Sequence, residues 1–174
     1  GMNLPEVADA LGAAEAASER RMDVRRTADG VTVINDSYNA NPDSMRAALK
    51  SLAVMARSGD TPRRTWAVLG EMAELGEDSV TEHDLIGRFL VRLDVSQLVV
   101  VGAGRPQRAL FQGAVQEGSW GSEAEHVHTV DEALALLDGS LRPGDIVLVK
   151  ASAAVGLWSV AEHVLATRGE EKSA

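Results

Sequence analysis

The sequence predicts an α/β domain with a Rossmann-like open sheet, mostly parallel, one antiparallel edge strand and helices on both faces. Five β-rich apolar runs are each followed by a segment with helical character, and this alternation is typical of βαβ units. Helices that connect parallel strands cover both faces of the sheet. An Asp29-Gly30 pair lies between two extended segments, and this hairpin signal makes the first strand an antiparallel edge strand.

The amino-terminal residues predict a helix and then the edge strand. Residues 4–17 are alanine-rich and should be helical, and Gly1-Met2 is interpreted as a cloning remnant. Residues 22–26 are expected to be extended and to reach the next strand through a turn at 27–30. The remaining strands are expected at residues 31–35, 65–69, 97–101, 126–129 and 145–149.

The first helix after a strand is expected at residues 42–57. Asn41 is a favourable N-cap residue, Pro42 suits the first helical position, and Asp43 complements the positive end of the helix dipole. The apolar side chains recur at the spacing of one helical face, which would pack on the sheet. These residues are Met45, Ala48, Leu49 and Leu52.

A second amphipathic helix is expected at residues 79–93, and further helices complete the βαβ alternation. The apolar stripe of the helix at 79–93 consists of Leu85, Ile86, Phe89, Leu90 and Leu93. The other helices are expected at residues 105–117, 131–138 and 155–167.

Composition favours a single domain without a membrane span. The chain has 174 residues and 45% hydrophobic content, but no apolar run of about 18 residues or more. We expect a lead-in at 1–20, one domain at 21–168 and a polar tail at 169–174 that frays. With no cysteine and no signal-like segment, a cytoplasmic location is expected. The formal charge of −9 argues against a broad nucleic-acid surface.

A polar segment at residues 35–44 connects a predicted buried strand to the helix at 42–57. Because it follows the carboxyl end of the strand, it lies where open α/β sheets bind their ligands. This segment, Asn35-Asp-Ser-Tyr-Asn-Ala-Asn-Pro-Asp-Ser44, resembles a signature of the Mur ligase family. Two more blocks agree with it: Val68-Leu-Gly-Glu-Met-Ala-Glu-Leu-Gly76 with His83 and Gly87, and Gly144-Asp-Ile-Val-Leu-Val-Lys150.

The resemblance extends from about Arg21 onward and is to the carboxyl-terminal domain of the branch that adds D-alanyl-D-alanine to the cell-wall precursor. It implies an ATP-dependent amide ligase of peptidoglycan synthesis. This enzyme joins the dipeptide to a UDP-N-acetylmuramoyl tripeptide through an acyl phosphate. Because no Gly-x-x-x-x-Gly-Lys-Ser/Thr loop occurs, the segment is interpreted as one domain of a longer enzyme and should be inactive alone. Mg²⁺ would be bound mainly by the family's central domain, which is absent from these residues along with the amino-terminal domain.

The resemblance implies a nucleotide-binding role for the first polar block. Arg21 would reach the nucleotide phosphates, although the adjacent Arg20 leaves this assignment open, and a surface arginine is the alternative. Asp36 would accept hydrogen bonds from the ribose hydroxyls, or else only form the turn. Tyr38, Asn39 and Asn41 would line the adenine and ribose side, while Asn41 can also act purely as a helix cap.

Substrate contacts are expected from the other two blocks. Glu71 or Glu74 would hold an ammonium group, and the alternative is that both face solvent. Lys150 would pair with a substrate carboxylate, and Ser152 lies in the same block but lacks the context of a nucleophile. Relatives have Gly-Ser-Arg after this lysine, whereas this chain has Ala151-Ser152-Ala153. We assign no catalytic residue.

Three further signals are interpreted as structural. Val101-Gly-Ala-Gly-Arg105 is similar to a dinucleotide fingerprint, but Gln107 replaces the third glycine, so a tight turn is expected. His126 and His128 share one face of a strand, and no third metal ligand is nearby in the sequence. His83 is expected to be satisfied by its neighbours rather than to carry protons.

Two alternative functions remain open at this point. One is another amide ligase of the same family, similar to folylpolyglutamate synthase, and the other is a nucleotide-binding module without catalysis. The Tyr-Asn-Ala-Asn-Pro turn favours the branch that uses D-alanyl-D-alanine over other branches.

Overall fold

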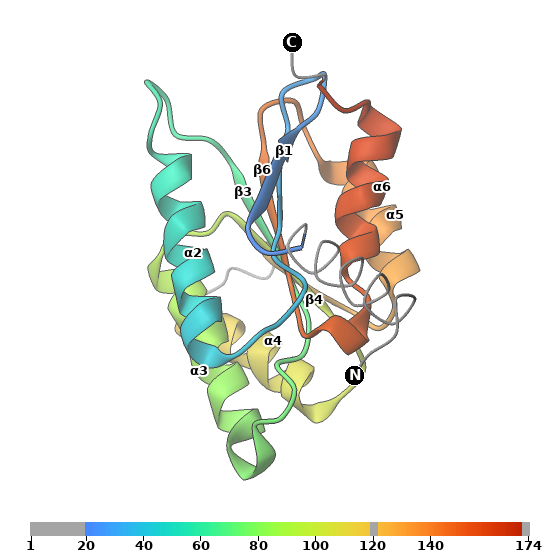
Figure 1. Ribbon diagram of the computed structural model, residues 1–174. Helices are drawn as coiled ribbons and strands as arrows, with labels where there is room; N and C mark the ends of the chain where they lie inside the picture. The colour runs from blue at the N-terminus through green and yellow to red at the C-terminus, as the bar shows by residue number, and fades with distance from the viewer. Residues whose placement is uncertain (1–19, 119–121, 172–174) are drawn as a thin grey trace, which may run out of the picture.

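The computed structural model describes residues 20–118 and 122–171, and these residues form one six-stranded sheet between two layers of helices (Figure 1). The strand order is β1-β2-β6-β3-β4-β5, with β1 antiparallel to β2 and the other neighbours parallel. The predicted fold class is therefore confirmed. The strands are β1 Asp23–Arg26, β2 Thr32–Asn35, β3 Thr65–Leu69, β4 Gln97–Val101, β5 Ala124–Val127 and β6 Ile146–Lys150.

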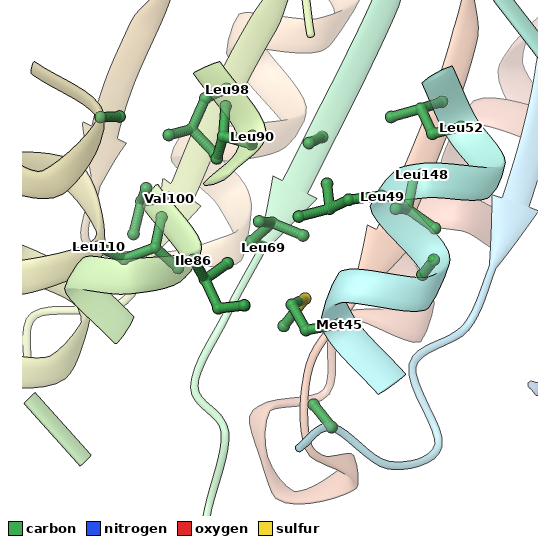
Figure 2. Packing of buried hydrophobic residues seen from close by; sticks show 14 of the residues in the cluster. Met45, Leu49, Leu52, Leu69, Ile86, Leu90, Leu98, Val100, Leu110 and Leu148 are labelled. Carbon is green, nitrogen blue, oxygen red and sulfur yellow. The ribbon is translucent and has the colours of Figure 1, made fainter. Parts of the chain in front are cut away.

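The helices divide between the two faces of the sheet. In Figure 1, α2, α3 and α4 lie on one side and α5 and α6 on the other. Figure 2 shows Met45 and Leu49 of α2 packing toward Leu69 and Leu148 of the central strands. The helices are α2 Pro42–Ala56, α3 Ser79–Arg92, α4 Arg105–Glu117, α5 Val130–Ser140 and α6 Trp158–Arg168. Short 3₁₀ turns are η1 Gly76–Asp78 and η2 Ala153–Val155.

Several predicted boundaries differ from the structure by one to three residues, and three of these differences have a local physical cause. The fifth strand spans 124–127 rather than 126–129, because Thr129 and Glu132 form the capping box that starts α5. The last helix begins at Trp158 rather than 155, because Gly156 has a φ of 74° and separates the 3₁₀ turn from α6. The sixth strand begins one residue later than expected, since the Asp145 side chain bonds within the preceding turn.

Helices α3 and α4 cross at two glycines. A Cβ atom on Gly87 would overlap the backbone of Leu110, and one on Gly113 would overlap the backbone of Asp84. The two helices therefore pack backbone to backbone, which any larger residue at either glycine would prevent.

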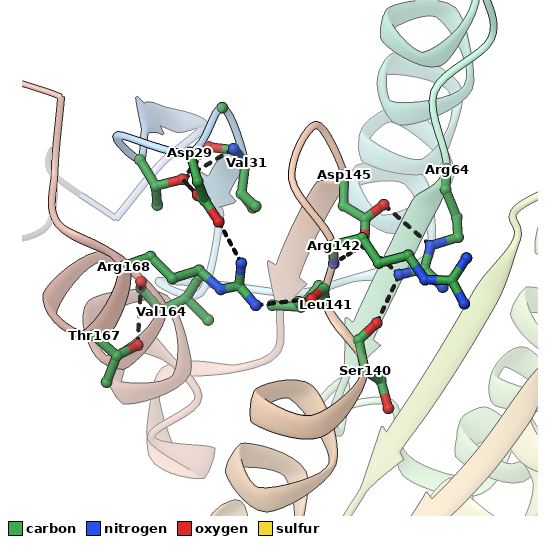
Figure 3. Close-up of polar contacts among 12 residues, drawn as sticks. Asp29, Val31, Arg64, Ser140, Leu141, Arg142, Asp145, Val164, Thr167 and Arg168 are labelled. Atoms are coloured by element: carbon green, nitrogen blue, oxygen red, sulfur yellow. Dashed lines mark hydrogen bonds and ion pairs between the residues drawn. The ribbon is translucent and has the colours of Figure 1, made fainter.

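The amino edge of the sheet contains a polar network centred on Asp145, which is only 4% exposed. Its carboxylate accepts hydrogen bonds from the Arg64 guanidinium, at 2.6 and 3.1 Å, and from the Trp66 indole N–H, at 3.0 Å. The backbone N–H of Arg142 is a further donor. Figure 3 shows the bonds of Asp145 with Arg64 and Arg142 beside the contact of Arg64 with the Ser140 carbonyl oxygen.

Two more arginines bind the loops at this edge. Arg63 donates to the carbonyl oxygens of Gly30, Gly144 and Asp145 and to the Thr32 hydroxyl. Arg168 pairs with Asp29 at 2.6 Å and donates to the Leu141 carbonyl oxygen, as Figure 3 shows. The guanidinium groups thus connect the ends of β1, β3, β6 and α6.

The tail was expected to fray from residue 169, but residues 169–171 are hydrogen-bonded to the end of β1. Ala28 N–H donates to Gly169 O, Glu171 N–H donates to Arg26 O, and Glu170 forms an antiparallel bridge with Thr27. The end of β1 offered unpaired backbone groups, and these residues satisfy them. The helix expected at 4–17 and residues 172–174 lie outside the described residues. No helix within the described ranges is long and apolar enough to cross a membrane.

Candidate functional site

The polar turn after β2 is organised by hydrogen bonds within the turn. Ser37 donates its hydroxyl to Asn35 Oδ1 at 2.6 Å, and Ala40 N–H donates to Asn39 Oδ1 at 2.8 Å. Asn41 is the N-cap of α2: its side chain accepts from Ser44 N–H at 2.8 Å, while the Ser44 hydroxyl accepts from Asn41 N–H. The predicted cap is confirmed, and it fixes where the turn ends and the helix begins.

Asp36 and Lys150 form a buried ion pair beneath this turn. Their Oδ2 and Nζ atoms are 2.7 Å apart, and the side-chain exposures are 13% for Asp36 and 1% for Lys150. The ammonium also donates to Asn39 O at 2.8 Å and to Asp36 O at 3.4 Å. All three ammonium hydrogens thus have acceptors in the turn. The expected pairing of Lys150 with a substrate carboxylate stays a prediction, and in this structure the ammonium points inward and bonds to the turn.

The segment Arg20–Met22, here called the leading segment, lies against the same turn. Met22 N–H donates to Asp36 Oδ1 at 3.2 Å, and Tyr38 N–H donates to Arg20 O at 3.2 Å. Met22 has a φ of 51°, an unfavourable backbone conformation for a residue with a side chain. Both carboxylate oxygens of Asp36 therefore have protein donors, and Asp36 joins the leading segment to β6.

The structure separates the two candidate arginines. The Arg21 guanidinium lies 4.5 Å from the centre of the Tyr38 ring, whereas the Arg20 guanidinium lies 4.7 Å from the Trp158 ring on α6. Arg21 lines a groove of about 400 Å³ between the leading segment and α2, together with most of the predicted nucleotide-binding residues. The lining residues are Arg21, Met22, Asp36, Asn39, Asn41, Ser44, Ala47, Ala48, Ser51 and Lys150.

Part of this groove was missed by the sequence reasoning. Ser44, Ala47, Ala48 and Ser51 form a wall of small side chains on α2. Because these residues are three or four positions apart, they lie on one side of the helix, and this pattern of small residues is visible in the sequence. It was overlooked because the larger apolar residues define the core-facing side.

The loop after β3 is bound to three other elements. Met72 N–H donates to His83 Nε2 at 3.0 Å, and His83 Nδ1 lies 2.6 Å from Ser79 O, which requires the proton on Nδ1. Ser152 N–H donates to Glu71 O, and Ala73 N–H donates to the Ser152 hydroxyl oxygen at 2.8 Å. His83 is thus satisfied by its neighbours as expected, and burial lowers its pKa below 6.5. Ser152 is predicted to lie on the substrate side, and in the structure its backbone N–H and its hydroxyl bond to this loop.

The two glutamates of this loop differ in their surroundings. Glu71 is half-buried, and its Oε2 accepts from the Gln107 amide at 3.3 Å. Glu74 is exposed and has a φ of 64°. Of the two, Glu71 is the carboxylate that the fold orients.

The glycine turn after β4 is filled by a side chain of its own helix. Gln107 packs against Gly102 and Gly104 at the start of α4, where a Cβ on either glycine would meet its amide. This explains why the segment similar to a dinucleotide fingerprint is a tight turn: the space for a phosphate is taken. His126 bonds to Gly102 O at 2.7 Å and stacks on Phe111. Across residues 20–118 and 122–171 no group of three or more His, Asp or Glu side chains is placed to hold a metal ion.

Comparison with known proteins supplies the family. The family model described as Mur ligase, glutamate ligase domain, matches residues 20–153. The chain belongs to the Mur ligase family. The match begins at the leading segment and includes the polar turn, Glu71, Gln107 and Lys150, so the groove and its surroundings all lie within the Mur ligase domain.

The relatives of this Mur ligase domain are longer than the chain. It is 58% identical over 170 residues to a UDP-N-acetylmuramoyl-tripeptide–D-alanyl-D-alanine ligase of Mycobacterium leprae, covering 93% of the chain and 33% of the relative. It is 57% identical over 177 residues to the protein of that name in Mycobacterium tuberculosis, covering 95% and 35%. The chain thus spans about a third of the length of these curated relatives.

Solved structures agree on the fold of the Mur ligase domain. A MurF ligase from Thermotoga maritima, solved in complex with ADP, superposes with a TM-score of 0.66 at 26% identity, covering 83% of this chain and 30% of that one. A MurF from Acinetobacter baumannii superposes with a TM-score of 0.68 at 27% identity, covering 84% and 30%.

Proposed function

We propose that this chain is the carboxyl-terminal domain of the ATP-dependent ligase that joins D-alanyl-D-alanine to a UDP-N-acetylmuramoyl tripeptide in peptidoglycan precursor synthesis. The groove beside Arg21 is the observation that carries the proposal, because it gathers a guanidinium, a carboxylate and amide groups at the edge of the sheet where ligands bind. The names of the relatives with 57–58% identity support this branch over one similar to folylpolyglutamate synthase.

In the proposed reaction, an oxygen of the tripeptide carboxylate attacks the γ-phosphorus of ATP, and ADP leaves with the bond's electron pair. The dipeptide ammonium gives one proton to water, and the neutral amine attacks the acyl carbon of the resulting acyl phosphate. The bond from carbon to the phosphate oxygen then breaks, inorganic phosphate leaves with its electron pair, and the nitrogen loses a second proton to form the amide.

The residues of this chain would act chiefly by binding and orientation. Arg21 would hold nucleotide phosphate oxygens, and Asn39 and Asn41 would line the base and ribose side of the groove. Tyr38 does not line the groove and would contribute from beside it, through the ring that packs on Arg21. Asp36 already accepts two protein hydrogen bonds, yet each carboxylate oxygen has a second lone pair that a ribose hydroxyl could fill. Lys150 would act indirectly, by fixing Asp36 and the carbonyl oxygen of Asn39.

On the amine side, Glu71 is the better candidate for the ammonium group. It is half-buried and held by Gln107, whereas Glu74 is exposed. The described residues offer no cluster suited to Mg²⁺, so we propose that the ion is held by other parts of the full-length enzyme and derive no step from it. We place the reaction in the cytoplasm, where ATP is available.

The test uses the full-length protein that contains this chain. It should release phosphate and form the amide only when ATP, the UDP-muramoyl tripeptide and D-alanyl-D-alanine are all present. Arg21→Ala should raise the KM for ATP about tenfold or more, since it removes a charge-assisted hydrogen bond, while Arg20→Ala should change it little. Nucleotide binding without amide formation would instead identify a non-catalytic binding module.

This chain by itself should be inactive and should bind ATP very weakly, because it supplies only one side of the proposed site between domains and so presents few contacts. Calorimetry with ATP measures the affinity. Tight binding by the isolated chain would contradict the proposed division of the site between domains.

A further inference from the structure

Three consecutive residues of the loop after β3 are bound to α3, to α4 and to the segment after β6. The backbone of Glu71 is bound by Ser152 after β6, and its carboxylate by Gln107 on α4. Met72 N–H is bound by His83 on α3, and Ala73 N–H by the Ser152 hydroxyl. Such a loop cannot shift without breaking several hydrogen bonds. The carboxylate of Glu71 is therefore presented in one orientation while remaining half-exposed.

Gln107 is an unusual residue for its position. Its side chain is 5% exposed, its Nε2 donates to Glu71 Oε2, and its Oε1 is a buried atom without a hydrogen-bond partner among the described residues. A buried acceptor without a donor costs stability. The amide cannot be turned over to remedy this, because its oxygen would then face the Glu71 carboxylate. The Gln107 amide thus leaves its oxygen without a donor while its N–H group bonds to Glu71.

We propose that Gln107 is a positioning residue for the amine substrate: it orients Glu71 so that the free carboxylate oxygen binds the ammonium group of the incoming dipeptide. This inference rests on the proposed function. A carboxylate that accepts an N–H bond on one oxygen is fixed in rotation, and its other oxygen then has a defined direction. An α-amino group is largely protonated near neutral pH, so a fixed carboxylate suits its recognition.

For a Gln107→Met variant, the positioning role and a purely structural role predict the same stability but different kinetics. If Gln107 only fills the glycine turn, an apolar residue of similar length would fill it equally well and would remove the unpaired oxygen. Gln107→Met should then preserve or raise the melting temperature with no kinetic effect. If Gln107 orients Glu71, the same variant should preserve or raise the melting temperature and weaken use of the dipeptide.

The experiment compares two nucleophiles in the full-length enzyme. D-alanyl-D-alanine needs its ammonium bound, whereas hydroxylamine, which is small and mostly neutral, traps the acyl phosphate as a hydroxamate without such a site. We expect Gln107→Met to raise the KM for D-alanyl-D-alanine about tenfold, the usual effect of one hydrogen bond to a charged group, with kcat at saturating dipeptide little changed. Hydroxamate formation and the KM for ATP should stay at the wild-type level.

Two further variants sharpen the result. Gln116→Met removes a glutamine of the same helix that bonds Arg88 and should leave every kinetic constant unchanged. Glu71→Gln should raise the KM for the dipeptide, and adding Gln107→Met to it should raise the KM no further, since both act through one carboxylate.

Three results would overturn the proposal: an unchanged dipeptide KM in Gln107→Met, an equal loss with hydroxylamine, or additive effects in the double variant. A wild-type enzyme that forms hydroxamate but no amide with D-alanyl-D-alanine would refute the proposed function itself. A wild-type enzyme that makes the amide, with a Gln107→Met variant that matches it, would refute only the role of Gln107.

Discussion

At the amino edge of the sheet, Arg63, Arg64 and Arg168 direct their guanidinium groups into loops and bond to carbonyl oxygens and carboxylates. At the carboxyl edge, Lys150 is the buried cation, and it lies under a groove whose walls remain open. The arginines hold loops together, whereas the lysine supports the polar turn that borders the groove. A cation near a strand end therefore does not by itself mark a binding site; the distinction lies in whether open space remains beside it.

The largest expected effect is at the carboxyl edge, in Lys150→Met. Removing the ammonium leaves the buried Asp36 carboxylate without its charged partner, which should lower the free energy of unfolding by about 3–5 kcal/mol. Urea denaturation followed by circular dichroism measures it.

Lys50→Met, at a surface position of α2, is the matched control and should change stability little. The double variant Lys150→Met/Asp36→Asn should recover part of the loss, because the unpaired charge is gone. If Lys150→Met were as stable as the wild type, the ion pair would not be the support of the turn.

At the amino edge, Asp145→Ala should lower the free energy of unfolding by about 2–4 kcal/mol, because the Trp66 N–H and the Arg64 guanidinium lose a buried acceptor. Because Asp145 lies at the edge opposite the groove, this variant should leave the KM for ATP of the full-length enzyme unchanged. Asp138→Ala, which removes a half-exposed partner of His163, serves as the control. A raised KM for ATP in Asp145→Ala would contradict the separation of the two edges.

A smaller effect concerns pH and the loop after β3. Burial lowers the pKa of His83 below 6.5, so the folded state binds fewer protons than the unfolded state. The stabilisation from neutral His83 is complete above pH 6.5 and decreases as the pH falls from there through the folded-state pKa. As the pH is lowered from about 8 to about 5, the urea midpoint of unfolding should therefore fall more steeply in the wild type than in His83→Gln. Equal slopes would mean that His83 titrates normally.

The smallest predicted effect separates two roles of Asn41. Asn41→Ala should cost about 1 kcal/mol of stability through loss of the cap, and Asn41→Ser should restore it. If Asn41 also contacts the nucleotide, the serine variant will regain stability but not the wild-type KM for ATP. Full recovery of both properties would assign Asn41 to capping alone.

Local chemistry in the sequence was enough to predict most of the fold. The cap at Asn41, the Asp29-Gly30 hairpin and the apolar face of α2 are decided by near neighbours, and each is confirmed. The start of α6 was missed because it depends on Gly156, whose left-handed conformation has no periodic signal. The position of β6 between β2 and β3 was not predicted, since strand order depends on contacts distant in sequence.

The site was predicted less completely than the fold. Asp36, Asn39 and Asn41 share the groove as expected, because one short turn carries them. The inward direction of Lys150 and the contact of Gln107 with Glu71 could not be predicted, since each joins residues that are distant in the sequence and that only the folded sheet brings together. From the sequence, a charged residue at a strand end can be assigned to one edge of the sheet, but whether its side chain faces the solvent cannot be inferred.

The crossing of α3 and α4 at Gly87 and Gly113 has a mechanical consequence. His83 lies on α3 and Gln107 on α4, and the two residues hold adjacent parts of one loop. Because the helices meet backbone to backbone, neither can slide without the other. The loops that follow β3 and β4 should therefore move together as one unit.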